Sequence, residues 1–138
     1  MDARETTRQL FDAWNNRDWD TIRSALHPEF IYTGPDGQQA RGIEDGLTVG
    51  WKDHADGLPD GRLELNALYA DGDVVVTEFT VRGTHNGTWL GIAPTGKSVE
   101  ANLCNVIEFK DGKIFRERDY LDTLGVFVQL GVVQMPSP

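Results

Sequence analysis

Apolar side chains recur at helical spacing in the first fifth of the chain. Between residues 2 and 14 they fall at positions i, i+3, i+4 and i+7, which predicts an amphipathic helix. Asp2 and Glu5 stand three residues apart, as in the capping box that begins many helices. A second, shorter helix is predicted over residues 18–26: Asp18 can cap it, and Pro28 ends it by disfavouring helical conformation in the residue before it. The two helices are expected to form a hairpin.

The next segment contains a short apolar run and a further helical pattern. Residues 30–32 predict a brief strand, and the turn-forming residues 34–37 follow it. Apolar spacing predicts a third helix over residues 43–51. Gly46 and Gly50 weaken this prediction, since each glycine costs about 1 kcal/mol relative to alanine within a helix.

Further along the chain the apolar period changes from 3.6 to two, which is typical of strands. Segments 62–69 and 74–81 flank an Asp-Gly pair and predict a β-hairpin. Segments 99–109 and 113–121 predict a second hairpin, closed by a three-residue loop at 110–112. Helices followed by hairpin-connected strands indicate an α+β fold, in which the helices cover one face of a curved antiparallel sheet.

Length and charge narrow the classes of function. The 138 residues suit one domain spanning 1–138, with 134–138 as a flexible tail. The 22 acidic residues outnumber the 13 basic ones, and the net charge of −9 makes nucleic acid and anionic membranes poor partners. The chain has no apolar run long enough to span a bilayer, and its N-terminus lacks the pattern of a signal peptide. A cytoplasmic location is therefore expected.

Neither a metal nor a cofactor is expected. His27, His54 and His85 are far apart, and no cysteine or carboxylate cluster completes a metal site. His27 is expected at a helix end and His54 at the surface, whereas His85 is a candidate lining residue. Residues 91–98 match the phosphate-binding loop in form, but an extended segment follows where that loop requires a helix, so we interpret them as a connection between strands. Cys104 lies in mid-strand and is expected to be buried and unreactive.

The last hairpin places polar side chains on an apolar face. Pleating keeps the odd-numbered residues of both strands together. These residues are Leu103, Asn105, Ile107, Phe109, Phe115, Glu117, Asp119 and Leu121. Asn105 and Asp119 stand out as polar neighbours, and burial would raise the pKa of Asp119, as enzymes do to obtain a general base.

Two alternatives to a buried, unpaired Asp119 stay open. The carboxylate pairs with a neighbouring arginine, or the face is reversed. The opposite face carries Glu108, Arg116 and Arg118 and is expected to face solvent or a second subunit. Because an open sheet leaves a face and an edge uncovered, a homodimer or homotetramer is expected.

Aromatic residues are concentrated in the helical half of the chain, and their ring surface exceeds what a core of this size needs. They are Trp14, Trp19, Phe30, Tyr32, Trp51 and Trp89. This supply predicts a cavity for a flat, mostly apolar ligand.

Short motifs follow one another in a specific order over most of the chain. They are His27-Pro28-Glu29-Phe30, Arg41-Gly42, His85-Asn86-Gly87, the segment from Gly91 to Lys97, Asp111-Gly112-Lys113-Ile114, Arg118-Asp119 and Gln129-Leu130-Gly131. In order and spacing they resemble the SnoaL-like polyketide cyclases of the NTF2-like superfamily, in particular the cyclases of nogalonic and aklanonic acid methyl esters in anthracycline biosynthesis. The resemblance implies a cone-shaped α+β barrel around an internal cavity.

The resemblance also implies a cofactor-free acid/base enzyme of aromatic polyketide antibiotic biosynthesis. Asp119 matches the aspartate of the Arg-Asp pair, which would remove a proton from a carbon flanked by carbonyls, start an intramolecular aldol cyclisation and return the proton to the new alkoxide. Asn105 would be its polar catalytic partner. The side chains expected to bind the substrate are Trp14, Phe30, Tyr32, Trp51, His85, Leu103, Phe115 and Leu121.

Asn105 departs from the cyclases, which carry a histidine at this place. An amide donates a hydrogen bond to an enolate oxygen but cannot carry a proton. The chain also resembles related hydroxylases of anthracycline precursors, which would need oxygen and a partner reductase. A third alternative is a non-catalytic NTF2-like ligand-binding module, which predicts a solvated or ion-paired Asp119 and a cavity too small for three fused rings.

Overall fold

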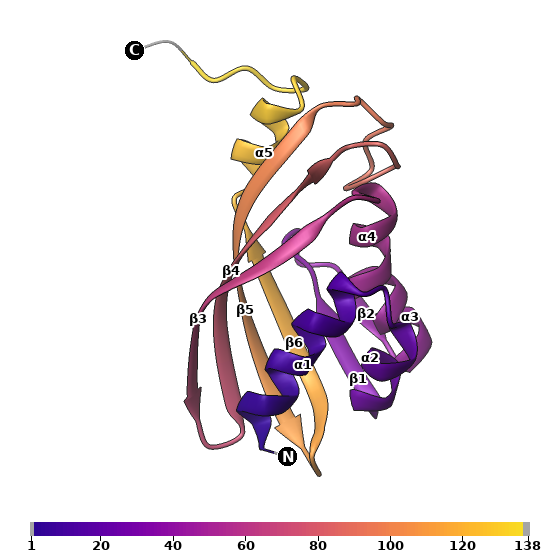
Figure 1. Ribbon diagram of the computed structural model, residues 1–138, viewed down its shortest axis with the longest axis vertical. Coiled ribbons are helices and arrows are strands. Elements are labelled where there is room, and N and C mark those ends of the chain that lie inside the picture. Colours follow the sequence, from indigo (N-terminus) through magenta and orange to yellow (C-terminus); the bar gives the residue numbers. More distant parts are fainter. Residues whose placement is uncertain (1, 137–138) are drawn as a thin grey trace.

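The computed structural model describes residues 2–136 and begins with two helices joined by a tight turn (Figure 1). Helix α1 spans Ala3–Asn15, and the Asp2 carboxylate caps it by accepting a hydrogen bond from the Glu5 backbone N–H. Helix α2 spans Trp19–Ala25 and is capped in the same way by Asp18. The two predicted helices and their capping residues are confirmed.

The predicted third helix is divided into three short helical turns. Helix α3 (Ile43–Leu47), a π-helical turn η1 (Thr48–Lys52) and helix α4 (Asp53–Gly57) follow one another. A Cβ atom at Gly46 would lie 2.3 Å from the Phe30 ring, and one at Gly50 would lie 2.8 Å from the Tyr32 ring. The two glycines that weaken the helical pattern therefore allow this segment to pack directly on the strand that contains both rings.

The strands form one six-stranded curved sheet in the order β2-β1-β6-β5-β4-β3. Their bounds are Leu26–Thr33 (β1), Gln39–Arg41 (β2), Arg62–Asp71 (β3), Val74–Thr84 (β4), Ser98–Lys110 (β5) and Lys113–Leu121 (β6). The pairs β3–β4 and β5–β6 are the two predicted hairpins. The expectation of a wholly antiparallel sheet was wrong, since β1 pairs with β6 in parallel. The brief strand predicted at 30–32 is part of the longer strand β1. Its parallel neighbour β6 is the last strand of the chain and follows both hairpins.

The turn between β5 and β6 is shorter than predicted. Asp111 and Gly112 have positive φ angles of 54° and 74°, and Lys110 pairs with Lys113 around this two-residue turn. The predicted three-residue loop 110–112 is thus wrong, because Asp111 joins Gly112 in the left-handed region.

A bulge at Phe115 changes the register between β5 and β6. It shifts the register by one residue, so that Asn105 lies directly opposite Asp119. Odd-numbered residues share the inner face beyond the bulge, as predicted. Nearer the turn, Ile114 takes the buried place and Phe115 is displaced to the outer side, where its ring stacks edge-on with His27 at a centroid distance of 5.3 Å.

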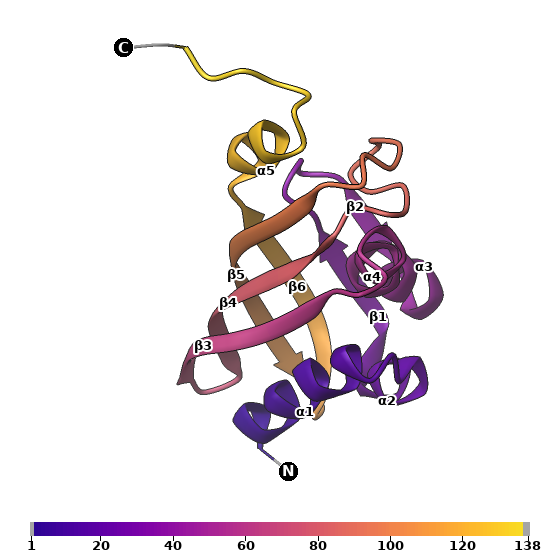
Figure 2. The same cartoon turned by 45° about the horizontal axis from the view of Figure 1, so that its top comes forward.

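Helices α1, α3 and α4 lie over one face of the curved sheet, and the core fills the space between the two layers (Figures 1 and 2). Helix α5 (Thr123–Gln129) packs beside β5 near the C-terminus. Of the predicted tail 134–138, residues 134–136 form no helix or strand, and residues 137–138 lie outside the described part. The single domain 1–138 stays a prediction. Within residues 2–136, no helix has the length and apolar character that a membrane span requires.

Residues 85–97 form an irregular connection between β4 and β5. An extended strand follows the segment that imitates a phosphate-binding loop, as predicted, and not a helix. His85 is fully buried beneath this connection. Its Nδ1 accepts the Thr95 backbone N–H at 3.2 Å, and its Nε2 lies 3.2 Å from the Ile92 carbonyl oxygen. His85 therefore holds the connection in place.

Candidate active site

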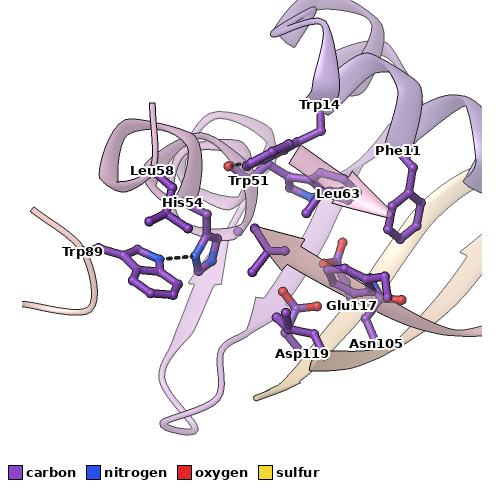
Figure 3. Close-up of a pocket in the computed structure, with 14 residues that line it drawn as sticks. Phe11, Trp14, Trp51, His54, Leu58, Leu63, Trp89, Asn105, Glu117 and Asp119 are labelled. Carbon is purple, nitrogen blue, oxygen red and sulfur yellow. Dashed lines mark hydrogen bonds between the residues drawn. The ribbon is translucent and has the colours of Figure 1, made fainter. Parts of the chain in front are cut away.

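A small cavity lies between the helical layer and the inner face of β5 and β6; we call it the inner chamber (Figure 3). Its volume is about 40 Å³, room for about two water molecules. Aromatic and aliphatic side chains form most of its wall, namely Phe11, Trp14, Trp51, Leu58, Leu63, Phe79, Val81, Trp89 and Leu103. Its polar side chains are His54, Asn105, Glu117 and Asp119.

Asp119 and Asn105 face each other on adjacent strands at the floor of the chamber. Asp119 is only 6% exposed, and the Tyr32 hydroxyl donates a hydrogen bond of 2.9 Å to its Oδ2. The Thr77 hydroxyl donates to the Asn105 Oδ1. Because that oxygen is occupied, the amide N–H groups of Asn105 stay available as donors beside Asp119, whose ionised form they favour.

Burial raises the pKa of Asp119 to about 6, and hydrogen bonds from Glu117, Tyr32 and Asn105 limit the rise. The alternative of an arginine partner for Asp119 does not hold. Arg118 lies on the outer side of the sheet, where it donates to Glu108 Oε2 at 2.6 Å. Asp119 is therefore a buried carboxyl group that titrates close to neutrality.

Glu117 is a second buried carboxyl group in the chamber, and the sequence analysis assigned it no role. It is 1% exposed and lies on the same face of β6 as Asp119, two residues away. Burial, and next the neighbouring charge of Asp119, raise the pKa of Glu117 well above its usual range. The alternation of β6 had already placed Glu117 on the inner face, and that position was the available signal.

Three buried polar atoms of the described residues lack a hydrogen-bond partner, and all three line the chamber: Trp51 Nε1, Glu117 Oε1 and Asp119 Oδ1. The two carboxyl groups hydrogen-bond each other once one of them holds a proton. The Trp51 indole N–H is oriented so that it favours the ionised form of Glu117. Orphaned polar atoms of this kind mark the place where a ligand's polar group would be received.

Trp14 and Trp51 form the aromatic wall opposite the carboxyl groups (Figure 3). The Trp14 indole N–H donates to the Trp51 backbone carbonyl at 2.9 Å, which fixes the end of α1 on the π-helical turn. Both residues were predicted to bind the substrate, and both line the chamber.

His54 and Trp89 form the wall at the opposite end from Phe11 (Figure 3). The Trp89 indole N–H donates to His54 Nδ1 at 2.9 Å, so the ring proton of His54 resides on Nε2. Burial lowers the pKa of His54 to about 4 and keeps the imidazole neutral. The prediction of His54 at the surface was wrong: Leu47, Trp51, His54 and Leu58 continue one helical face, and that spacing was the signal.

Beyond this wall lies a larger, open hollow of about 730 Å³, which we call the outer groove. It shares His54 and Trp89 with the inner chamber. Its other lining residues are Tyr32, Gly34, Pro35, Asp36, Gln38, Val49, Asp53, Asp56, Thr88, Leu90, Gly91, Thr123 and Phe127. Tyr32 thus connects the two spaces, because it lines the groove and bonds to Asp119 in the chamber.

The other residues predicted to bind the substrate are dispersed. Leu103 lines the chamber, whereas Leu121 borders a shallow hollow on the outer side of the sheet. Phe30 is fully buried against Gly46, and His85 supports the β4–β5 connection. Phe115 lies outside both spaces because of the bulge. The prediction of a buried Cys104 was wrong, since the side chain is only partly buried; desolvation raises the pKa of its thiol.

No cluster of three or more potential metal ligands occurs within residues 2–136. The polar groups in and beside the chamber are carboxyl, amide, hydroxyl and neutral imidazole groups. Such a set can move a proton between a carbon acid and a carboxylate and can donate hydrogen bonds to a developing negative charge.

Comparison with known proteins gives consistent matches over nearly the whole chain. Residues 4–130 match the family described as SnoaL-like polyketide cyclase. Aklanonic acid methyl ester cyclase AcmA of Streptomyces galilaeus is 30% identical over 128 residues, which cover 90% of this chain and 87% of AcmA.

Two solved structures agree with this match and with the predicted α+β fold. A protein from Jannaschia sp. CCS1, assigned as a SnoaL-like polyketide cyclase, has a TM-score of 0.85 at 26% identity, covering 94% of this chain and 92% of that protein. AclR of Streptomyces galilaeus, assigned as a hydroxylase, has a TM-score of 0.82 at 25% identity, covering 97% of this chain and 87% of AclR.

Proposed function

The chain belongs to the SnoaL-like polyketide cyclase family, and we propose that it closes a ring of an aromatic polyketide ester by intramolecular aldol addition. The observation that carries this proposal is the environment of Asp119. It is a buried carboxylate with no cationic partner, held by hydrogen-bond donors beside an aromatic wall. A general base with a pKa of about 6 is well matched to proton abstraction near neutral pH.

The reaction begins with the Asp119 carboxylate. It removes a proton from a carbon flanked by two carbonyl groups, and the negative charge passes to an enolate oxygen. The enolate carbon attacks a ketone of the same molecule, and the new alkoxide takes up a proton. The Asn105 amide and the Trp51 indole N–H are the donors placed to stabilise the charged oxygens.

The substrate's rings are assigned to the outer groove. The inner chamber is too small for three fused rings, as the ligand-binding alternative predicts, whereas the groove has the volume of a typical small-molecule site. The other expectation of that alternative, a solvated or ion-paired Asp119, is not met. Only the reacting edge of the substrate would enter the chamber, past Tyr32 and the His54–Trp89 wall.

Hydroxylation is the second candidate, and Asn105 favours it. An amide stands where the cyclases carry a histidine, and it cannot relay a proton. The structural similarity to AclR also favours hydroxylation. In this alternative the same base would form the enolate of an electron-rich ring, which then reacts with oxygen delivered with the help of a reductase.

Incubation of the protein with aklanonic acid methyl ester separates the candidates. We expect a ring-closed isomer of unchanged mass, formed without reductant or oxygen. A product heavier by one oxygen atom, dependent on NADPH and a reductase, would instead establish hydroxylation. Ester that binds in the groove and is recovered unaltered would leave only a binding role.

A further inference from the structure

The inner chamber holds two carboxyl groups where the proposed reaction has used one. Glu117 and Asp119 both project from the inner face of β6, about 7 Å apart along the strand by its rise per residue. His54 is the only other titratable side chain of the chamber wall, and it is neutral. No positive charge therefore compensates a second negative one.

Two adjacent carboxylates buried without a cation cannot both stay ionised near neutral pH, so the pair retains one proton. The hydrogen bonds decide where it resides. Asp119 accepts from the Tyr32 hydroxyl, and Asn105, directly opposite on β5, also favours its ionised form. Glu117 faces only the Trp51 indole N–H besides Asp119. The negative charge accordingly lies on Asp119 and the proton on Glu117.

We propose that Glu117 is the proton donor of the ring closure and Asp119 its base, so that one carboxyl group removes a proton and the other supplies one. This inference rests on the proposed cyclisation. Its geometric support is that Glu117 Oε1 and Trp51 Nε1 both belong to residues of the chamber wall and have no hydrogen-bond partner among the described residues. An alkoxide oxygen between them would receive two donors.

The protons balance over one turnover. Asp119 takes a proton from the acidic carbon, and the carbon–carbon bond forms as the ketone oxygen becomes an alkoxide. Glu117 gives its carboxyl proton to that alkoxide. The proton now on Asp119 passes across the hydrogen bond to the Glu117 carboxylate, which restores the starting pair without solvent or an external acid.

Glu117→Gln separates the two steps, because the amide keeps the shape and a donor N–H but has no proton to give. With aklanonic acid methyl ester in D₂O, we expect ring closure to slow by about 10²- to 10⁴-fold. The variant still accelerates deuterium exchange at the acidic carbon above the protein-free rate, since Asp119 is intact. Asp119→Asn is expected to lose both activities.

The matched control is Glu78→Gln, which makes the same change at an exposed position on the outer side of β4. It should leave closure and exchange at wild-type rates. If Glu117→Gln closes the ring within a few-fold of wild type, or loses exchange together with closure, Glu117 is not the donor. Wild-type protein that closes no ring counts against the proposed function instead.

Carboxyl ¹³C NMR of wild-type protein labelled at Glu and Asp side chains tests the proton's location without any substrate or variant. We expect one glutamic acid that remains protonated at about neutral pH and titrates together with an aspartate. A spectrum in which every glutamate is ionised at that pH would overturn the inference.

Discussion

Asp119 is surrounded by groups that move its pKa in opposite directions. Loss of water around the carboxylate raises the pKa, and hydrogen bonds from Glu117, Tyr32 and Asn105 lower it again. The result, about 6, leaves most of the group ionised at neutral pH while keeping it a stronger base than an exposed aspartate. Each donor can be removed separately, so the balance can be tested one residue at a time.

Tyr32→Phe removes the hydroxyl that donates to Asp119 Oδ2. Because that bond favours the ionised form, its loss should raise the pKa of Asp119. A hydrogen bond to a charged group is worth about 1.5–3 kcal/mol, so the acid limb of the kcat/KM profile should move up by about one to two pH units. Tyr120→Phe, at an exposed tyrosine on the outer side of β6, is the control. An acid limb that stays in place or moves to lower pH would show that Asp119 is not the group titrating.

Glu117→Gln should also change how stability depends on pH. Burial first, and Asp119 next, raise the pKa of Glu117 above its value in the unfolded chain. The folded protein therefore binds a proton that the unfolded chain releases above about pH 4.3. Wild-type stability from this group is fully present below that pH and is lost as the pH rises toward the raised pKa. The variant has no such proton to lose.

Urea denaturation of wild type and Glu117→Gln across this pH range measures the effect. The difference in unfolding free energy should shift in favour of the variant by up to about 1.4 kcal/mol per pH unit. A difference that does not vary with pH would contradict a protonated, buried Glu117.

At the scale of elements, the segment α3–η1–α4 is shaped by close approach to β1. Alanine is normally a better helix residue than glycine, but a Cβ at Gly46 or Gly50 meets an aromatic ring of β1. Gly46→Ala should therefore destabilise the protein by about 1–3 kcal/mol despite its higher helix propensity. Thr48→Ala, at an exposed position of the same segment, should not. Chemical denaturation distinguishes the two, and a stabilising Gly46→Ala would contradict the packing described.

The helices and hairpins could be predicted from the sequence where local signals agree. Capping by Asp2 and Asp18 and the alternation of β5 and β6 depend on neighbours along the chain. The parallel pairing of β1 with β6 could not be predicted, because it joins strands separated by most of the chain and leaves no local pattern. The π-helical turn depends in the same way on rings contributed by β1.

The part of the site that could be predicted is the part that depends on the alternation of side chains along β5 and β6. Asn105 and Asp119 were correctly predicted to be neighbours on one face, because odd-numbered residues of β5 still lie opposite odd-numbered residues of β6 beyond the bulge. Phe115 was misplaced because the bulge and the two-residue turn are backbone features that the apolar pattern does not encode. His54 was expected at the surface, which is the usual place of an isolated histidine, and Glu117 was placed on the inner face but given no role because only Asn105 and Asp119 were singled out there.

For the whole molecule, the acidic excess behind the net charge of −9 extends to the outer groove. Three exposed carboxylates, Asp36, Asp53 and Asp56, line the outer groove, and none of the groove's lining residues is a lysine or arginine. Burial, and next the charge of Asp56, raise the pKa of Asp53. The groove is therefore suited to a neutral ester and opposes a free carboxylate.

The double variant Asp53→Asn, Asp56→Asn tests this selection. Binding of aklanonic acid, the free acid, should tighten by about three- to tenfold at low salt, while binding of its methyl ester stays nearly constant. Tryptophan fluorescence gives both dissociation constants, and high salt should reduce the difference. Asp45→Asn, an exposed change outside the groove, is the control. Equal effects on acid and ester would show that the rim does not select by charge.

The expected homodimer or homotetramer stays a prediction. Tyr120 is more than half exposed on the outer side of the sheet, next to the shallow hollow that includes Leu121 and Cys104. Light scattering coupled to size-exclusion chromatography determines the oligomeric state directly.

The proposal depends above all on Asp119 as the base. Asp119→Asn preserves the side-chain shape and its contact with Tyr32 but removes the basic carboxylate. The initial rate of ring closure of aklanonic acid methyl ester, compared between wild type and this variant at equal thermal stability, is the most direct test. We predict a loss of at least about 10²-fold. A rate within a few-fold of wild type would contradict the account.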